Sequence, residues 1–146
     1  MKIAVTGGSG VVGGAVVRHL LGAGHEVVAL ARSERASETL SQLGAPPMRG
    51  DVLDSPSLHR LVEGADWVFH IAGVNEMCSR DPDRMDQVNI EGTRNVITAC
   101  RQASVRRMVH TSSAVTLGEE TGEIGSESTQ HRGYHRSRYE RSKHMS

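Results

Sequence analysis

The chain has 146 residues, a length that suits one domain with an adequate hydrophobic core. Its 17 basic and 17 acidic side chains balance, so no net field attracts nucleic acid or anionic lipid, and we expect neither as a partner. No apolar run approaches the about 20 residues that span a bilayer, and the first glycine comes too early for a signal peptide. Cys78 and Cys100 lack a metal-ligand pattern and are interpreted as free thiols, so we expect a soluble, cytoplasmic protein.

The first half of the chain alternates short apolar runs with longer helical patterns. It predicts strands at residues 3–5, 26–30 and 46–51, and helices at residues 11–21, 34–43 and 55–62. Gly22 and Gly24 end the first helix, and Ser55-Pro56 resembles an N-cap with proline at the first helical position.

The second half continues the alternation. It predicts strands at residues 66–71 and 107–111, a long helix at residues 82–103, a loop at residues 117–133 and a last helix that begins near Arg136 or Ser137. Val88, Val96 and Ile97 should face inward on the long helix. Strands that alternate with helices form a parallel sheet through right-handed crossovers. We therefore expect an α/β fold, a Rossmann-like doubly wound parallel sheet of about five strands in one domain over residues 1–146.

Three glycines follow the first strand. Gly7, Gly10 and Gly13 lie between that strand and the helix that Val11 and Val12 begin. A pyrophosphate is held best by backbone N–H groups at a helix N-terminus, and its close approach requires residues without a Cβ. This strand–turn–helix context predicts a dinucleotide-binding loop, although glycine also serves in plain structural turns.

The glycine spacing, Gly-x-x-Gly-x-x-Gly after a threonine, resembles the extended short-chain dehydrogenase/reductase family. Further segments resemble the motifs of that family, in the same order: Gly50-Asp51-Val52, His70-Ile71-Ala72-Gly73, Asn89-Ile90-Glu91-Gly92-Thr93-Arg94-Asn95 and Thr111-Ser112-Ser113-Ala114. The resemblance implies that Asp51 and Val52 contact the adenine and that Ala72 and Gly73 line the cofactor.

The end of the second strand bears on the choice of cofactor. NAD-dependent enzymes usually place a carboxylate there, whereas NADP-dependent enzymes place an arginine. This chain has Ala31-Arg32-Ser33, and a guanidinium suits a phosphate, with Ser33 or Arg35 as further contacts. We expect NADP, with NAD as the alternative; Arg32 could instead stack on the adenine or remain a solvated surface residue.

A tyrosine and a lysine lie one helical turn apart near the end of the chain. Tyr139 and Lys143 share a helix face, and an ammonium beside a phenol favours the phenolate. The resemblance implies that Tyr139 is the general acid/base and that Lys143 also binds the nicotinamide ribose. It further implies that Ser113 hydrogen-bonds the reacting oxygen, with the adjacent Ser112 as the competing choice.

Other tyrosine and histidine residues fit such a site less well. Tyr134 has Arg138 four positions later, and arginine does not replace a lysine that must tune a phenol and bind ribose. His131, His135 and His144 share a basic C-terminal stretch, and none has another ligand at a zinc-like spacing. We therefore expect structural or surface histidines and no metal site.

The family resemblance implies an NAD(P)-dependent oxidoreductase that acts on a small carbonyl or sugar substrate. Dehydratases usually have Thr-Asp-Glu where this chain has Ser113-Ala114-Val115, so a reductase of the dihydroflavonol-reductase-like branch or an epimerase with bound NAD is expected. A non-catalytic NADP-sensing module is the alternative of another class. Family members continue well past the Tyr–Lys helix, so we expect a cofactor-binding portion of a longer enzyme with little activity. The incomplete sheet would expose apolar surface and favour a homo-oligomer.

Overall fold

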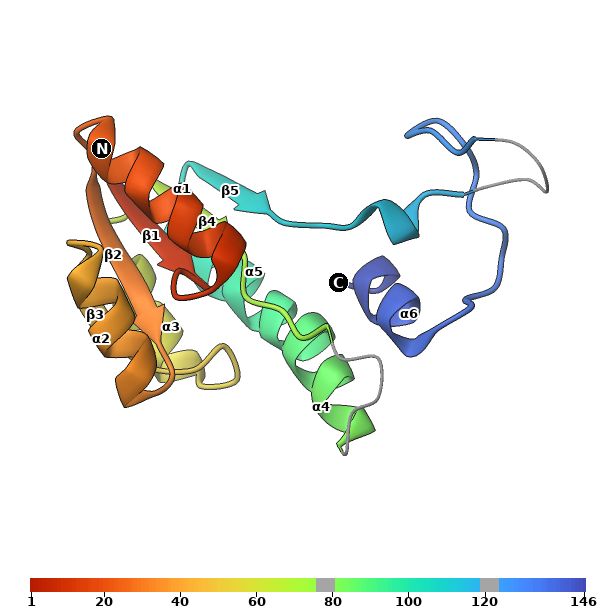
Figure 1. The fold of residues 1–146 in the computed structure, drawn as a ribbon, viewed down its shortest axis with the longest axis horizontal. Coiled ribbons are helices and arrows are strands. Elements are labelled where there is room, and N and C mark those ends of the chain that lie inside the picture. Colours follow the sequence, from red (N-terminus) through yellow and green to blue (C-terminus); the bar gives the residue numbers. More distant parts are fainter. Residues whose placement is uncertain (76–80, 119–123) are drawn as a thin grey trace.

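The computed structural model describes residues 1–75, 81–118 and 124–146. Within these ranges, one parallel sheet forms in the order β3-β2-β1-β4-β5 (Figure 1). Its strands are β1 (Lys2–Thr6), β2 (Glu26–Ala31), β3 (Pro47–Arg49), β4 (Trp67–His70) and β5 (Arg107–His110). The central strand β1 pairs with β2 through Val5 and Ala29 and with β4 through Val5 and Phe69. This order confirms the Rossmann-like doubly wound sheet.

Helices cover both faces of the sheet. They are α1 (Val11–Gly22), α2 (Glu34–Gln42), α3 (Ser55–Val62), α4 (Pro82–Asp86), the π-helical turn η1 (Gln87–Glu91), α5 (Gly92–Gln102), the 3₁₀ turn η2 (Ala114–Thr116) and α6 (Arg138–His144). Figure 1 shows α1 and α5 on opposite sides of the strands. Because the side chains of a strand alternate between the faces, each face contributes to a separate apolar core.

The two cores differ in the helices that close them. On one face, Val5 and Ala29 pack with Val17 of α1 and Leu40 of α2. On the other face, strand residues including Ala4 and Val68 pack with residues of α3 and α5; the helical members are Leu58, Leu61, Val62, Val96, Ala99 and Cys100. Burial of apolar area at about 25 cal/mol per Å² makes these two layers the main source of stability. Cys100 is a buried free thiol, and Cys78 lies outside the described residues.

The predicted long helix has three parts. The sequence pattern predicted one helix over residues 82–103, whereas the structure inserts η1 between α4 and α5. A π-turn adds a residue to the local helical repeat, and such turns recur at functional positions. Here the turn contains Asn89, whose side chain is buried at 1 % exposure. Val88 and Val96 are also buried, as the pattern predicted, whereas Ile97 is only partly buried.

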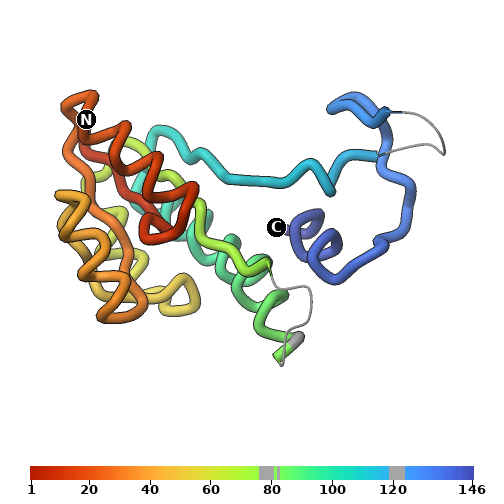
Figure 2. Tube along the Cα trace, in the orientation of Figure 1, coloured from red at the N-terminus to blue at the C-terminus, as the bar shows by residue number. Residues whose placement is uncertain are grey.

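The chain leaves the sheet after β5. Figures 1 and 2 show that the chain extends away from the sheet after β5, passes through η2 and then returns to α6. Helix α6 lies on the side of α5 that is farther from β2 and β3. The 3₁₀ turn η2 contacts α6, and α6 also contacts α4 and η1. Among the described residues, no helix has the length and apolar character needed to cross a membrane. The position of α6 matters because it carries Tyr139 and Lys143.

Candidate functional site

A cavity of about 710 Å³ opens where the strands end. Carboxyl ends of parallel strands gather the loops that carry ligand sites in doubly wound folds. The described lining does not include Arg35, but it includes the other residues that were predicted for the cofactor site: Gly7, Gly10, Val11, Val12, Gly13, Arg32, Ser33, Asp51, Val52, Ala72, Gly73, Tyr139 and Lys143. Tertiary structure thus brings separate segments of the chain to one cavity.

The protein itself requires two of the three loop glycines. Gly7 has a φ of +75°, and a Cβ there would lie 2.5 Å from the backbone nitrogen of Ala72. A Cβ on Gly13 would lie 2.0 Å from the carbonyl oxygen of Gly7. These contacts pack the start of α1 against the glycine loop and the loop against the segment after β4, so Gly7 and Gly13 shape the loop whether or not a ligand binds.

Gly10 is different, because the protein leaves space beside it. In the described part of the chain, the nearest atom to a Cβ on Gly10 would be the Gly7 carbonyl oxygen, at 3.4 Å, an ordinary contact. Gly10 is the N-cap of α1, and no side chain caps that helix. Val11 and Val12 follow with 93 % and 57 % exposure. The first turn of α1 therefore presents backbone N–H groups to the cavity, an arrangement that suits a pyrophosphate.

The far end of the cavity lies beside β2 and β3. Arg32, the first residue after β2, is exposed and lines the cavity with Ser33. The Ser33 hydroxyl accepts from the Ala36 N–H at 3.2 Å and so caps α2. Asp51 also lines the cavity, and its Oδ1 accepts from the Leu53 N–H at 3.0 Å. A guanidinium and a helix N-terminus at this end provide positive potential for an anionic group.

The buried side-chain amide of Asn89 connects the segment after β4 to α6. Asn89 Oδ1 accepts from the Val74 N–H at 2.7 Å, and Asn89 Nδ2 donates to the Val74 carbonyl at 2.9 Å. The same nitrogen donates to Ser142 Oγ at 2.9 Å. Sequence reasoning placed Asn89 in a family motif but assigned it no role. The sequence feature that could have identified it is a polar residue next to Val88, among the inward-facing positions of the predicted helix.

The Tyr–Lys pair lines the cavity from α6. Lys143 is 8 % exposed, and its Nζ donates to the Thr111 carbonyl, just after β5, at 2.7 Å. Burial lowers the pKa of the Lys143 ammonium. A Cβ on Gly73 would lie 4.0 Å from Lys143 Nζ, so this charge lies above the segment after β4. The same cavity is thus lined by the N-terminal turn of α1 and by the Tyr139 phenol and the Lys143 ammonium.

The two adjacent serines have different positions. Ser112 lines the cavity, whereas the described lining does not include Ser113. Ser113 is the N-cap residue of η2, and its hydroxyl accepts from the Val115 N–H at 3.4 Å. The catalytic role of Ser113 stays a prediction, and the cavity makes Ser112 its direct competitor.

The tyrosine and histidine residues that the sequence analysis excluded from the site lie outside the described cavity lining. Tyr134 is 57 % exposed, and the Arg132 guanidinium lies 5.2 Å from the centre of its ring. The structure also brings His131, His135 and His144 together, which spacing along the sequence did not indicate. The cavity lining in the described part of the chain includes none of these residues.

Comparison with known proteins shows similarity to a dehydrogenase family, to reductases and to epimerases. The sequence profile of the 3-beta hydroxysteroid dehydrogenase/isomerase family matches residues 4–146. A 2-alkyl-3-oxoalkanoate reductase of Stenotrophomonas maltophilia is 41 % identical over 112 residues, which are 77 % of this chain and 33 % of that protein. A UDP-glucose 4-epimerase of Streptomyces lividans is 36 % identical over 123 residues, 81 % of this chain and 37 % of that protein.

A solved structure matches over almost the whole chain. The UDP-glucose 4-epimerase of Thermus thermophilus, in complex with NAD, superposes with a TM-score of 0.82 at 31 % identity. The match covers 99 % of this chain and 48 % of that one. The chain spans about one third of the length of the curated relatives that it matches.

Proposed function

The chain belongs to the 3-beta hydroxysteroid dehydrogenase/isomerase family, and we propose that it is the dinucleotide-binding part of an NAD(P)-dependent reductase. Membership confirms the resemblance to extended short-chain dehydrogenases and reductases. The proposed reaction moves hydride between the cofactor and a carbonyl or hydroxyl carbon of a small substrate.

One observation supports the proposal above the others. A single cavity is lined by the exposed first turn of α1 and by Tyr139 and Lys143 of α6. A nucleotide-binding loop alone would serve a sensor, and a Tyr–Lys pair alone occurs by chance on helix surfaces. Their meeting in one cavity is what hydride transfer with coupled proton transfer requires.

The residues divide the chemistry as follows. A bound nicotinamide dinucleotide supplies or accepts the hydride. The α1 N-terminus binds the pyrophosphate, and Gly10 permits its close approach. Tyr139 donates a proton to the carbonyl oxygen of the substrate during reduction and removes it in the reverse direction. Lys143, held by the Thr111 carbonyl, keeps a positive charge beside the cavity, which favours the phenolate form that remains after proton donation.

Ser113 is proposed to hydrogen-bond the same substrate oxygen, as the resemblance implies. Ser112 lines the cavity and competes for this role. Replacing each serine by alanine in a protein that spans the full length of the relatives separates them, because the loss of an oxyanion donor lowers kcat about 10²- to 10³-fold. A larger loss in Ser112→Ala than in Ser113→Ala would transfer the role to Ser112.

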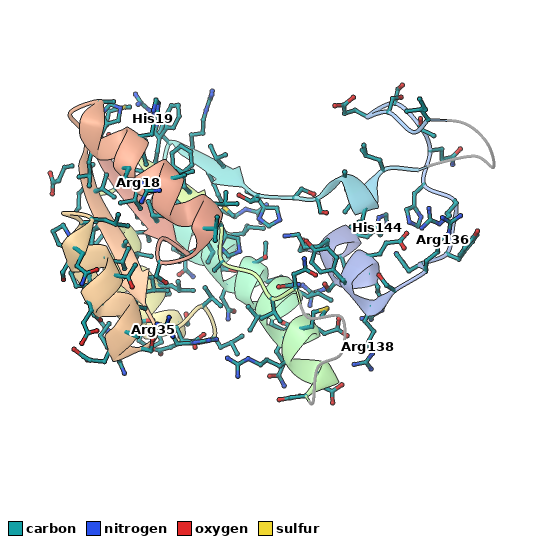
Figure 3. The ribbon with its side chains drawn as sticks, in the orientation of Figure 1. Arg18, His19, Arg35, Arg136, Arg138 and His144 are labelled. Atoms are coloured by element: carbon teal, nitrogen blue, oxygen red, sulfur yellow. The ribbon has the colours of Figure 1, made fainter. Side chains whose placement is uncertain are left out.

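We propose NADP(H) as the preferred cofactor, because Arg32 at the cavity rim suits a 2′-phosphate. The test is a fluorescence titration of the chain with NADPH and with NADH. Arg32→Ala should weaken NADPH binding about 10- to 100-fold, the range of a hydrogen bond between charged groups, and leave NADH binding unchanged. Arg18→Ala is the matched control, because Arg18 lies on α1 and outside the cavity lining (Figure 3).

The titration also separates the alternatives. Equal weakening of both cofactors by Arg32→Ala would overturn the phosphate assignment. Preference of the unmodified chain for NADH would favour an epimerase, an alternative to which the match with an NAD-bound UDP-glucose 4-epimerase already lends support. Binding without any carbonyl-dependent turnover, measured on a protein of the relatives' full length, would favour a non-catalytic sensor.

A further inference from the structure

Three imidazoles from separate parts of the C-terminal segment meet in space. His131 and His135 precede α6, and His144 is its last residue. The ring centroids are 5.0 Å apart for His131 and His135, 4.1 Å for His131 and His144, and 5.1 Å for His135 and His144. One ring nitrogen of each residue lies within 4.8 Å of the other two. Figure 3 labels His144 on α6, beside the segment that carries Arg136.

The cluster contains polar atoms that the protein does not satisfy. The His131 side chain is 18 % exposed. Among the described residues, the buried Nε2 atoms of His131 and His135 have no hydrogen-bond partner. A buried nitrogen without a partner is rare unless an ion or water satisfies it, and at His135 a metal ion bound through Nε2 would do so.

The electrostatic surroundings of His131 favour its neutral ring. Burial lowers the pKa of His131, and the neighbouring His144, His135 and Arg132 lower it further, while Glu140 raises it. Neutral imidazole is the form that binds a metal ion. The Arg132 guanidinium would oppose a metal cation, but it forms an ion pair with the buried Glu140 carboxylate, which offsets its charge.

We propose that His131, His135 and His144 bind one divalent first-row transition-metal ion, with Zn²⁺ as the best match. Imidazole ligands suit zinc, copper and nickel, and three histidines leave a fourth position for water. A tetrahedral zinc ion with Zn–N distances of about 2.0–2.1 Å holds its nitrogen ligands about 3.3 Å apart. Ring nitrogens within 4.8 Å of one another reach that spacing by side-chain rotation.

A hydrogen bond at His131 indicates how this ring would take part. The Gly133 N–H donates to His131 Nδ1 at 3.1 Å, which places the ring proton on Nε2. Ligation through Nδ1 replaces that hydrogen bond and leaves the Nε2 proton near Glu140 Oε1, 3.9 Å away. At this distance the carboxylate attracts the ring but does not form a hydrogen bond with it.

The proposed site is separate from the dinucleotide cavity and has a structural consequence. None of the three histidines belongs to the described cavity lining. A metal ion there would join the segment before α6 to the last residue of α6. Since α6 carries Tyr139 and Lys143, this metal would fix the helix that presents the catalytic pair.

The test is calorimetric titration of the EDTA-treated, untagged chain with Zn²⁺, together with the visible absorption of the Co²⁺-loaded chain. We expect one Zn²⁺ per chain and the d–d bands of tetrahedral Co²⁺. Loss of an outer-shell partner typically weakens metal binding 10- to 100-fold, so His135→Gln, which removes a ligand, should weaken it about 100-fold or more. His19→Gln on α1 is the control and should leave the affinity unchanged (Figure 3).

Three results would overturn the proposal. They are the absence of stoichiometric Zn²⁺ binding, equal affinities of His135→Gln and His19→Gln, and a Co²⁺ spectrum without tetrahedral bands. Circular dichroism checks that each variant is folded. If His135→Gln does not fold, His144→Gln replaces it, and the Co²⁺ spectrum of the unmodified chain decides if neither variant folds.

Discussion

Asn89 Nδ2 donates a hydrogen bond to Ser142 Oγ over 2.9 Å, from the π-turn η1 to the helix that carries Lys143. Ser142 in turn donates to the Tyr139 carbonyl at 2.8 Å. The same Asn89 side chain binds both backbone groups of Val74, in the segment after β4. The buried Asn89 carboxamide therefore fixes the position of α6 relative to the cavity. It does so through Ser142, the residue directly before Lys143.

Removing this carboxamide should loosen the site and the fold together. Asn89→Leu leaves the Val74 N–H and carbonyl and the Ser142 hydroxyl without this partner, and each buried unsatisfied group costs about 1–3 kcal/mol. We expect a loss of about 3 kcal/mol in the free energy of unfolding and weaker NADPH binding. Urea denaturation and fluorescence titration measure the two effects.

Asn95→Leu is the matched control for that change. Asn95 makes a hydrogen bond from Nδ2 to the Val52 carbonyl at 3.0 Å, and it is less buried than Asn89. Its replacement should cost about 1 kcal/mol. A loss equal to or larger than that of Asn89→Leu would refute the central role of Asn89.

Two glycines of the binding loop should respond in opposite ways. Gly13→Ala places a Cβ 2.0 Å from the Gly7 carbonyl oxygen, so the loop must move, and we expect a loss of at least about 3 kcal/mol in unfolding free energy. Gly10→Ala meets no such obstacle and should change stability by less than about 1 kcal/mol. It should weaken NADPH binding about tenfold, because the Cβ occupies space that the pyrophosphate needs.

Gly22→Ala serves as the control for both glycine variants. No atom of the described residues approaches a Cβ at Gly22, at the end of α1, within 4 Å. Thermal melts and NADPH titrations of the three variants give the comparison. Unchanged NADPH affinity in Gly10→Ala would show that the open space beside Gly10 is not used for the cofactor.

The two tyrosines of the C-terminal segment make a second comparison. Tyr139→Phe removes the proposed acid/base group and should lower kcat by about 10²- to 10⁴-fold, the usual contribution of general acid–base catalysis. Tyr134→Phe should leave kcat essentially unchanged, because Tyr134 is exposed and outside the cavity lining. The assay is carbonyl-dependent oxidation of NADPH by a protein of the relatives' full length. Comparable losses in both variants would contradict the assignment of Tyr139.

Acid should destabilise the fold through His70. Burial lowers the pKa of His70 to about 3, with further contributions from His110 and Lys143. Its hydrogen bonds agree with a neutral ring: Thr93 Oγ1 donates to the Asn89 carbonyl, so it accepts from His70 Nε2, and Thr6 Oγ1 faces His70 Nδ1 at 2.7 Å.

The direction of the pH effect follows from this lowered pKa. Between the ordinary histidine pKa of 6.5 and the folded value of about 3, the unfolded chain binds a proton at His70 and the folded chain does not. Stability is therefore complete above this window and falls as the pH decreases through it, by up to about 1.4 kcal/mol per pH unit. Denaturation midpoints of the unmodified chain and of His70→Gln, measured from neutral to mildly acidic pH, test the effect. His70→Gln should show a shallower acid limb, and equal slopes would count against His70.

Local sequence patterns were sufficient for most elements of the fold. Alternation of apolar strands and helices predicted β1, β2, β4 and β5 within about a residue. The apolar runs of β1, β2 and β4 are typical of parallel strands that helices cover on both faces, whereas β5 is a more polar strand at the sheet edge. The pattern overestimated β3, which is three residues long at the sheet edge. It also missed the π-turn η1, because one extra residue in a helical repeat does not disturb apolar periodicity enough to be seen.

By itself, the sequence determined the glycine loop, the strand–helix order and the Tyr–Lys spacing, since these depend on neighbours within one or two turns of the chain. Tertiary structure decided which side chains meet. It separated Gly10, which leaves room for a ligand, from Gly13, which the Gly7 carbonyl excludes from bearing a Cβ. It also brought Asn89 to Ser142 and His144 to His131. Such contacts depend on how helices pack across the sheet, and residue spacing along one chain carries no record of that packing.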